Sequence, residues 1–113
     1  MGSSLAIALF LSRVKTLVKD DKLLFQPRNR NKTWEFMLRE NLSEEDACNI
    51  IACLEPRHHH GGPYLDDNGS SGDVMIFTYP YEKTRLYIKL KIWTDTKGDA
   101  GVVMSFHEEG MYD

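Results

Sequence analysis

Residues 86–93 read LYIKLKIW, a run in which aliphatic side chains alternate with aromatic or cationic ones. A period of two is typical of a β-strand that buries one face and exposes the other. Residues 102–107, VVMSFH, alternate in a similar way, and the turn sequence Thr-Lys-Gly-Asp at 96–99 lies between the two runs. We therefore predict an antiparallel hairpin. Its core side is expected to hold these side chains: Leu86, Ile88, Leu90, Ile92, Val102, Met104 and Phe106.

The opposite side of this hairpin is the first candidate site. The predicted alternation places Tyr87 and Lys89 of the first strand beside Ser105 and His107 of the second. A tyrosine, a cation and a histidine would then be displayed together, with Lys91 one step further along. An ordinary solvated sheet face carries the same residue types, and composition alone favours that simpler interpretation.

The residues before the hairpin predict one more strand and three helices. Residues 74–79 read as a strand that reaches a turn at 81–84, and Leu23, Leu24 and Phe25 could form a short extended stretch. A helical stripe comes first in the chain, and its members are Ile7, Phe10, Leu11, Val14, Leu17 and Val18. Leu5 and Leu9 add apolar surface beside it, and we expect burial in the chain's own core more than contact with a partner.

Two shorter helices are predicted next. Residues 32–40 form the first, in which Trp34, Met37 and Leu38 share a face. Ser43 begins the second as an N-cap followed by acidic residues, and Pro56 is expected to end it. Its apolar positions follow helical spacing and are Ala47, Ile50, Ile51 and Leu54. Residues 57–72 are predicted to be a long loop.

Helices first and a strand meander second predict an α+β fold. We expect N-terminal helices packed on a three- to four-stranded antiparallel sheet. The 113 residues, 42% hydrophobic and 27% charged, fit one domain spanning 1–113, with residues 1–4 as a disordered leader. This composition excludes a disordered chain, a collagen-like repeat and a disulfide-dense miniprotein. Cys48 and Cys53 are expected to be reduced core fillers in a helix.

The apolar run at 5–11 is too short to span a bilayer and has no preceding charge, so we expect a cytoplasmic protein with no membrane partner. The net charge of −3 argues against a protein that coats DNA. The cations are clustered, however. Of the 14 Lys and Arg, eight lie within 13–39 and five within 83–97. A local cationic groove could therefore bind a phosphate backbone, with Tyr87 or Trp93 available for base stacking, although solubilising charges explain the clusters nearly as well.

The run His58-His59-His60 invites a metal site, but consecutive residues cannot easily all point at one ion, and no Cys or carboxylate stands at a tight ligand spacing. We expect no metal and no cofactor. A histidine near the sheet face is better suited to acid/base chemistry or phosphate contact. Sequence fingerprints for nucleotide loops, hydrolase serines and paired-cysteine sites are lacking as well.

Six short motifs, taken together in order and spacing, resemble the MqsR-like family of bacterial toxin–antitoxin toxins, within the RelE-like ribonuclease superfamily. The motifs are LSRVKTLV at 11–18, CNII at 48–51 with Leu54, Gly62-Pro63, Asp73-Val74 with Phe77, and LYIK at 86–89 with VMSFH at 103–107. The resemblance covers most of the chain from Leu11 onward. It implies a compact helix-plus-sheet fold and a metal-independent endoribonuclease that cleaves mRNA and is inhibited by a cognate antitoxin, itself expected to carry a DNA-binding helix-turn-helix domain.

The resemblance also implies roles for individual residues. Tyr87 matches the family's strand tyrosine, His107 follows Ser-Phe where the family carries Lys or His, and Lys89 is their electrostatic partner. These three are the expected catalytic residues. The loop that supplies a lysine in the best-known branch reads His-His-His-Gly here, and that branch's sheet glutamine has no clean match. We expect RNA contacts from the following residues: Arg85, Lys91, His58 and His60. The resemblance leaves open whether the ribosome takes part. A non-catalytic protein-binding or regulatory module on the same fold is the alternative.

Overall fold

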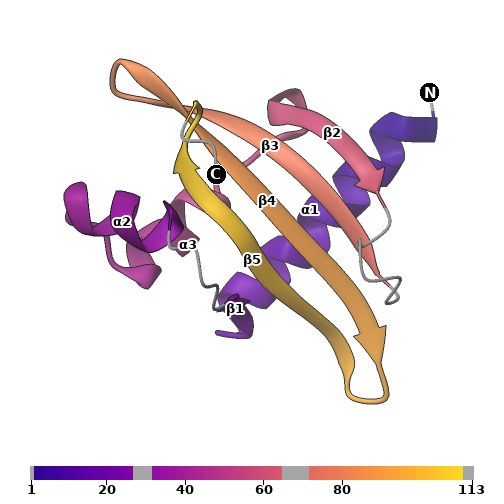
Figure 1. Cartoon of the computed structure of the whole chain (residues 1–113). Coiled ribbons are helices and arrows are strands. Elements are labelled where there is room, and N and C mark those ends of the chain that lie inside the picture. Colours follow the sequence, from indigo (N-terminus) through magenta and orange to yellow (C-terminus); the bar gives the residue numbers. More distant parts are fainter. Residues whose placement is uncertain (1, 27–31, 65–71, 111–113) are drawn as a thin grey trace.

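The computed structural model describes residues 2–26, 32–64 and 72–110 and has an α+β architecture (Figure 1). The elements follow in chain order: α1 (Gly2–Lys19), β1 (Leu23–Phe25), α2 (Lys32–Arg39), α3 (Glu44–Ile51), the 3₁₀ helix η1 (Pro56–His58), β2 (His59–Tyr64), β3 (Asp73–Tyr81), β4 (Thr84–Asp95) and β5 (Gly98–Glu108). Helices come first and the meander second, as the sequence predicts.

The sheet has five described strands in the order β1-β5-β4-β3-β2. Four of them form the antiparallel meander β2 to β5, and β1 pairs with β5 in parallel. The prediction of three or four antiparallel strands was therefore wrong in number and in the direction of one pair. A stretch of three residues is too short to show a period of two. Its partner strand, β5, also lies far away in the chain, so the local sequence cannot indicate which strand β1 pairs with.

Strand β2 replaces part of the predicted loop at 57–72. Its pairing with β3 is interrupted twice, between His59 and Gly61 and again between Gly61 and Tyr64. These irregularities, together with two glycines and a proline, remove the alternation by which a strand is recognised in sequence. The pairing with β3 supplies the order that the local sequence does not indicate. Residues 65–71 lie outside the described part of the chain.

A register shift in β5 corrects the predicted core. Lys89 pairs with Ser105, but the next residue of β4, Leu90, pairs with Val103. Met104 is thus an extra residue in β5, a β-bulge, and the alternation changes phase there. Val103 is buried in the core, whereas Val102 and Met104 are only half-buried and are absent from it. The prediction that Val102 and Met104 fill the core was wrong for this reason.

Helix α1 packs across one face of the sheet, behind it in Figure 1. The predicted stripe is buried except for Val18, which packs at its edge. Leu5 and Leu9 remain 64% and 57% exposed, so the expectation that they sit deeper in the core was wrong; they face away from the sheet. The helix begins at Gly2.

Of the two short helices, α2 packs on β5 and α3 contacts α1. Ser43 caps α3 through a reciprocal pair of hydrogen bonds: the Asp46 N–H donates to Ser43 Oγ, and the Ser43 N–H donates to the Asp46 carboxylate. The helix ends at Ile51, earlier than predicted, and Pro56 opens η1 instead. In α2 the buried residues are Phe36 and Met37, while Leu38 is 84% exposed, because the helix packs on β5 through its Phe36 side.

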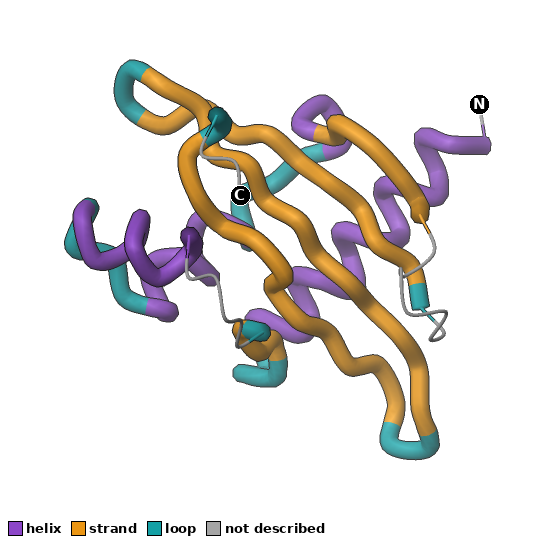
Figure 2. The backbone as a smooth tube through the Cα atoms, in the orientation of Figure 1, coloured by secondary structure: helices purple, strands orange, loops and turns teal. Residues whose placement is uncertain are grey.

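All of these helices lie behind or beside the sheet, and Figure 2 shows that none covers the face turned toward the viewer. The core lies between the helices and the covered face. The largest fully buried side chains are Phe36, Phe77, Phe106, Ile51, Leu54 and Met75. In the described part of the chain, no helix is long and apolar enough to cross a membrane.

Candidate functional site

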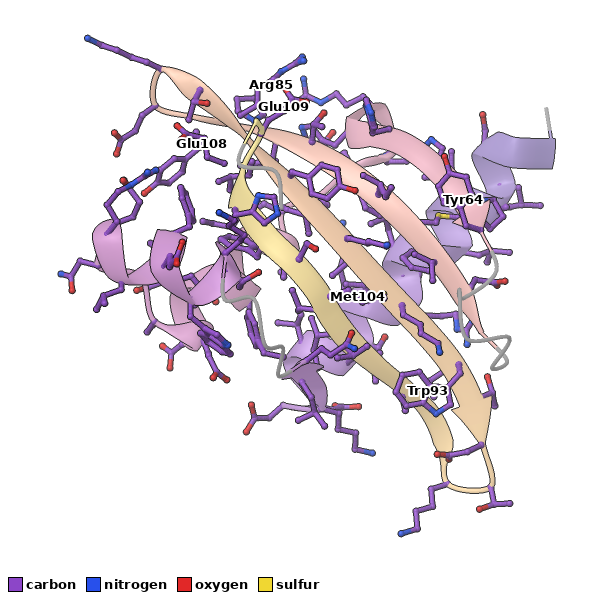
Figure 3. The ribbon with its side chains drawn as sticks, in the orientation of Figure 1. Tyr64, Arg85, Trp93, Met104, Glu108 and Glu109 are labelled. Carbon is purple, nitrogen blue, oxygen red and sulfur yellow. The ribbon has the colours of Figure 1, made fainter. Side chains whose placement is uncertain are left out.

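The side of the sheet that no described helix covers, called here the open face, brings together side chains from all five described strands. Cross-strand pairs on this side include Tyr87 with His107 and Lys89 with Ser105. Figure 3 shows Tyr64, Trp93 and Met104 on this side of the ribbon. The residues placed here by the register are Leu24, Tyr64, Val74, Ile76, Thr78, Arg85, Tyr87, Lys89, Lys91, Trp93, Ala100, Val102, Ser105 and His107.

Tyr87 and His107 form the centre of the open face. Their rings stack with centroids 5.4 Å apart and 16° between the planes. The Nδ1 atom of His107 lies 2.9 Å from the carbonyl oxygen of Glu108. A carbonyl can only accept, so Nδ1 carries the proton and donates it to this oxygen. In the neutral ring Nε2 then holds the free lone pair, which is the form that a general base needs.

Two cations predicted as functional flank this pair. Lys89 is next to Tyr87 on the same face and stands opposite Ser105, so the tyrosine, lysine and histidine expected to be catalytic do occupy one surface. Arg85 is exposed at the start of β4, where its carbonyl accepts a 2.7 Å hydrogen bond from the Glu109 N–H. Figure 3 places Arg85 and Glu109 together at that end of the sheet.

Further along β4, Lys91 and Trp93 make a second feature of the open face. The Lys91 Nζ atom lies 5.5 Å from the centroid of the Trp93 ring, a cation–π distance. Lys91 is only 9% exposed, although its position on the strand points away from the helices. Its stem is therefore packed between neighbours on this face, while its ammonium group is held against the indole.

Positive and negative charges are separated between the two sides of the sheet. Among the described residues, no Asp or Glu occupies an open-face position within 87–93 of β4 or 100–107 of β5. Asp99 instead faces α1, where Arg13 binds it through two hydrogen bonds of 2.8 and 3.0 Å. Glu108 faces α2 and pairs with Arg39 at 3.3 Å. Within these two stretches of the described strands, the charged side chains of the open face are therefore Lys89, Lys91 and, when protonated, His107.

The partners of Asp99 shift its ionisation. Hydrogen bonds from Arg13 and from the Thr94 hydroxyl hold the pKa of the Asp99 carboxyl below its ordinary value. The same contact raises the pKa of the Arg13 guanidinium. Both groups stay charged under physiological conditions, so this pair ties α1 to the β4–β5 hairpin and takes no part in proton transfer.

His58 and His60 do not join the Tyr87–His107 pair. His58 is buried on the helix side, where its ring packs edge-on against Tyr79 and its Nδ1 accepts a hydrogen bond from the Glu55 N–H. Burial, and secondarily the charge of Arg57, lowers the pKa of His58. Its role is structural. His60 is exposed on β2, which is separated from β4 by β3.

Within residues 2–26, 32–64 and 72–110, no group of three or more His, Cys, Asp or Glu is arranged to hold a metal ion. Both cysteines are free thiols. Cys48 is half-buried in α3, where burial raises the pKa of its thiol. Cys53 follows the helix and is exposed, so the prediction that it fills the core was wrong.

Several open-face residues escaped the sequence analysis. Ile76 and Thr78 of β3 stand beside Lys89 and Tyr87, and the alternation of β3 could have placed them there once its pairing was known. Tyr64 is 51% exposed at the end of β2, a strand that the sequence did not indicate. Leu24, 65% exposed, reaches this face only through the parallel pairing of β1.

The chain matches no protein-family model, and it finds no match among curated proteins or among solved structures.

Proposed function

We propose that this protein is a metal-independent endoribonuclease that cleaves mRNA on the open face of its sheet, and that it acts as the toxin of a toxin–antitoxin pair. One observation carries the proposal: Tyr87 and His107 are stacked on an uncovered sheet face beside Lys89. A base, a hydroxyl and a cation are the groups that cleavage of RNA through its own 2′-hydroxyl uses.

The chemistry follows from the hydrogen bond at His107. With Nδ1 donating to the Glu108 carbonyl, Nε2 is free to take the proton of the ribose 2′-hydroxyl. The 2′-oxygen attacks the adjacent phosphorus, and the bond from phosphorus to the 5′-oxygen breaks. The leaving oxygen takes a proton from the Tyr87 hydroxyl or from water. The products are a 2′,3′-cyclic phosphate and a 5′-hydroxyl.

Lys89 and Arg85 would stabilise the negative charge that develops on the phosphorane oxygens. A fixed cation aimed at developing charge is among the largest contributions to catalysis, because it needs no reorganisation during the reaction. Lys89 and Arg85 each stand one open-face position from Tyr87, on opposite sides of it. Lys89 is half-buried, whereas Arg85 is exposed at the start of β4. Arg85 therefore fits a contact to the RNA backbone better than a catalytic role.

The family resemblance extends this proposal to fold and partners. A RelE- or MqsR-like fold would place helices on one side of the sheet and leave the RNA-binding side free, as the arrangement of α1 and the open face allows. Under this proposal the partners are mRNA and a cognate antitoxin, which would silence the enzyme in unstressed cells. The ribosome is a further partner if cleavage requires translation.

The experiment is to incubate the purified protein with a long mRNA in EDTA and to determine the end groups of the fragments. We expect discrete cuts that leave 2′,3′-cyclic phosphates and 5′-hydroxyls. His107→Ala should lower the cleavage rate by about 10²–10⁴-fold, the usual contribution of a general acid or base. Lys89→Met should lower it by roughly 10²-fold through lost charge stabilisation.

Lys19→Met is the matched control, because Lys19 is an exposed lysine at the end of α1 on the helix side. Its cleavage rate should equal that of the unaltered protein. The cleavage assay is repeated with translating ribosomes, which detects an enzyme that cuts only ribosome-bound mRNA. An absence of cleavage in both assays, with folded protein, would refute the ribonuclease proposal, and full activity of folded His107→Ala would refute the role of that residue.

A second function, a non-catalytic protein-binding module, is favoured by one feature of α1. Leu5 and Leu9 lie four residues apart and are more than half exposed, as in a helix that docks on another protein. The two functions differ in their effect on cells. A toxin arrests growth when expressed alone and His107→Ala relieves the arrest, whereas a binding module is harmless in both forms.

A further inference from the structure

Trp93 occupies a built position on the open face that the cleavage chemistry does not use. On β4 it lies six residues from Tyr87, which corresponds to about 20 Å along an extended strand. Its cross-strand partner is the small residue Ala100. The ring is therefore held on the same surface as Tyr87 and His107 but well away from them.

The surroundings of Trp93 fix its orientation. The Lys91 ammonium is held 5.5 Å from the ring centroid, and the Lys91 stem is packed against the sheet. Gly72, the residue before β3, lies against both side chains: a Cβ atom added there would lie 3.1 Å from Trp93 Cβ and 3.0 Å from Lys91 Cε. Gly72 also has a φ of +127°, which disfavours any side chain. Backbone thus packs directly against both side chains.

We propose that Trp93, backed by Lys91, is a stacking platform for an unpaired base of single-stranded RNA, a few nucleotides away from the phosphate that reacts at Tyr87 and His107. This inference rests on the proposed function, because it identifies the substrate as a single strand that follows β4. It adds a second point of contact that fixes which phosphate reaches the histidine.

Charge complementarity selects this ligand. Between Tyr87 and Trp93 the open face presents the ammonium group of Lys89, and no Asp or Glu of the described strands occupies an open-face position there. A polyanionic backbone gains from this cation, while the flat indole accepts any base. A duplex would hide its bases from the ring, so the stacking contact requires a single strand.

The test separates binding from cleavage by means of a 2′-O-methyl RNA oligonucleotide of about ten nucleotides, the length that a strand-binding surface covers. This probe lacks the 2′-hydroxyl and cannot be cut. The sequence has two tryptophans, so Trp34→Phe leaves Trp93 as the sole tryptophan. Phenylalanine is chosen because Trp34 is half-buried against Phe25 and an aromatic ring keeps that contact. We expect the oligonucleotide to quench the fluorescence of that variant. Trp93→Ala should weaken binding by roughly tenfold or more, and His107→Ala should leave it nearly unchanged.

A series of oligonucleotides, each lacking one base, locates the contact. In the unaltered protein, loss of the stacked base should weaken binding by about tenfold at one position. In Trp93→Ala the same loss should have no further effect, because ring and base then act as one interaction. Lys97→Met, at the tip of the β4–β5 hairpin, is the control and should bind as the unaltered protein does.

The outcomes distinguish the two proposals. Equal binding by folded Trp93→Ala and the unaltered protein, with cleavage intact, would overturn the platform and leave the ribonuclease standing. Quenching and Trp93-dependent binding without any cleavage would support the platform and remove the ribonuclease. Failure to bind the oligonucleotide at all would overturn the platform whatever the cleavage assay shows, and would favour a protein ligand for this face.

Discussion

The covered and open faces of one sheet differ in what holds their side chains. On the covered face, Phe77, Ile88 and Phe106 are fully buried beneath the helices. On the open face, Tyr87, Lys89 and His107 are half-buried, and the Tyr87 ring stacks on that of His107 across the strands. The difference follows from the alternation of β4 and β5, since successive residues of one strand serve opposite faces. Stability and candidate chemistry are thus separated within single strands.

The charges follow the same division. Arg13 and Arg39 of the helices pair with Asp99 and Glu108 of β5, so these acids are used on the covered side. The lysines of β4 are left to the open face. A chain with a net charge of −3 can therefore carry a cationic surface without being basic overall. Net charge alone is a poor guide to binding when the fold segregates the charges.

The largest test of this comparison uses two adjacent residues of β5. Phe106 is fully buried and its ring lies 6.3 Å from that of Phe36, so Phe106→Ala should lower the free energy of unfolding by about 3–5 kcal/mol. His107→Ala removes a side chain from the open face and should cost about 1 kcal/mol or less. Urea titration measures both values. Similar losses for the two variants would contradict the division between the faces.

A smaller effect is expected at the pair that joins α1 to the β4–β5 hairpin. Arg13 and Asp99 are each about one-third exposed, at 32% and 36%, which weakens their attraction through solvent screening. A double-mutant cycle with Arg13→Met and Asp99→Asn should give a coupling of about 0.5–1 kcal/mol. The Arg39–Glu108 pair is longer and is the comparison. A coupling that does not decrease in high salt would argue against an ionic origin.

The smallest effect concerns pH. The pKa of His58 in the folded protein lies below its ordinary value of 6.5, chiefly because of burial. The folded state therefore prefers the neutral ring, and its stabilising contribution is complete above pH 6.5 and lost as the pH falls through the folded pKa. Arg57 adds to this shift, and Glu55 opposes it.

His58→Asn keeps an acceptor for the Glu55 N–H but cannot titrate. Thermal melts between about pH 7 and pH 5 should show a steeper loss of stability in the unaltered protein than in this variant. Parallel pH profiles would mean that His58 takes up its proton equally well in both states, and that its burial has no energetic consequence.

The residues of the candidate site could be predicted because they sit on the most regular part of the chain. Tyr87, Lys89, Ser105 and His107 follow from alternation on two strands joined by a short turn, and the register of β4 with β5 confirms that they share a face. Ser43 likewise caps its helix as predicted, since capping depends on residues three apart. Whether this surface cuts RNA stays a prediction.

The failures share a physical cause as well. The bulge at Met104 reverses the expected places of Val102 and Val103, because one inserted residue changes the phase of alternation between its two sides. Phe106 and His107, after the bulge, keep the faces that the sequence predicts. His58 looked like a surface histidine in a polar loop, yet η1 turns its ring onto Tyr79. In both cases the deciding contact comes from a part of the chain that the local pattern does not contain.

The sequence by itself determined the helices, the central hairpin and the side chains displayed together on its outer face, because periodicity and capping are local properties of a few residues. The tertiary structure decided which face is covered, how β1 and β2 extend the sheet, and which acids are paired with helix arginines. Those outcomes depend on contacts between residues far apart in the chain, such as Arg13 with Asp99. Folding therefore separates the paired acids Asp99 and Glu108 from the open face on which Lys89, Lys91 and Trp93 lie.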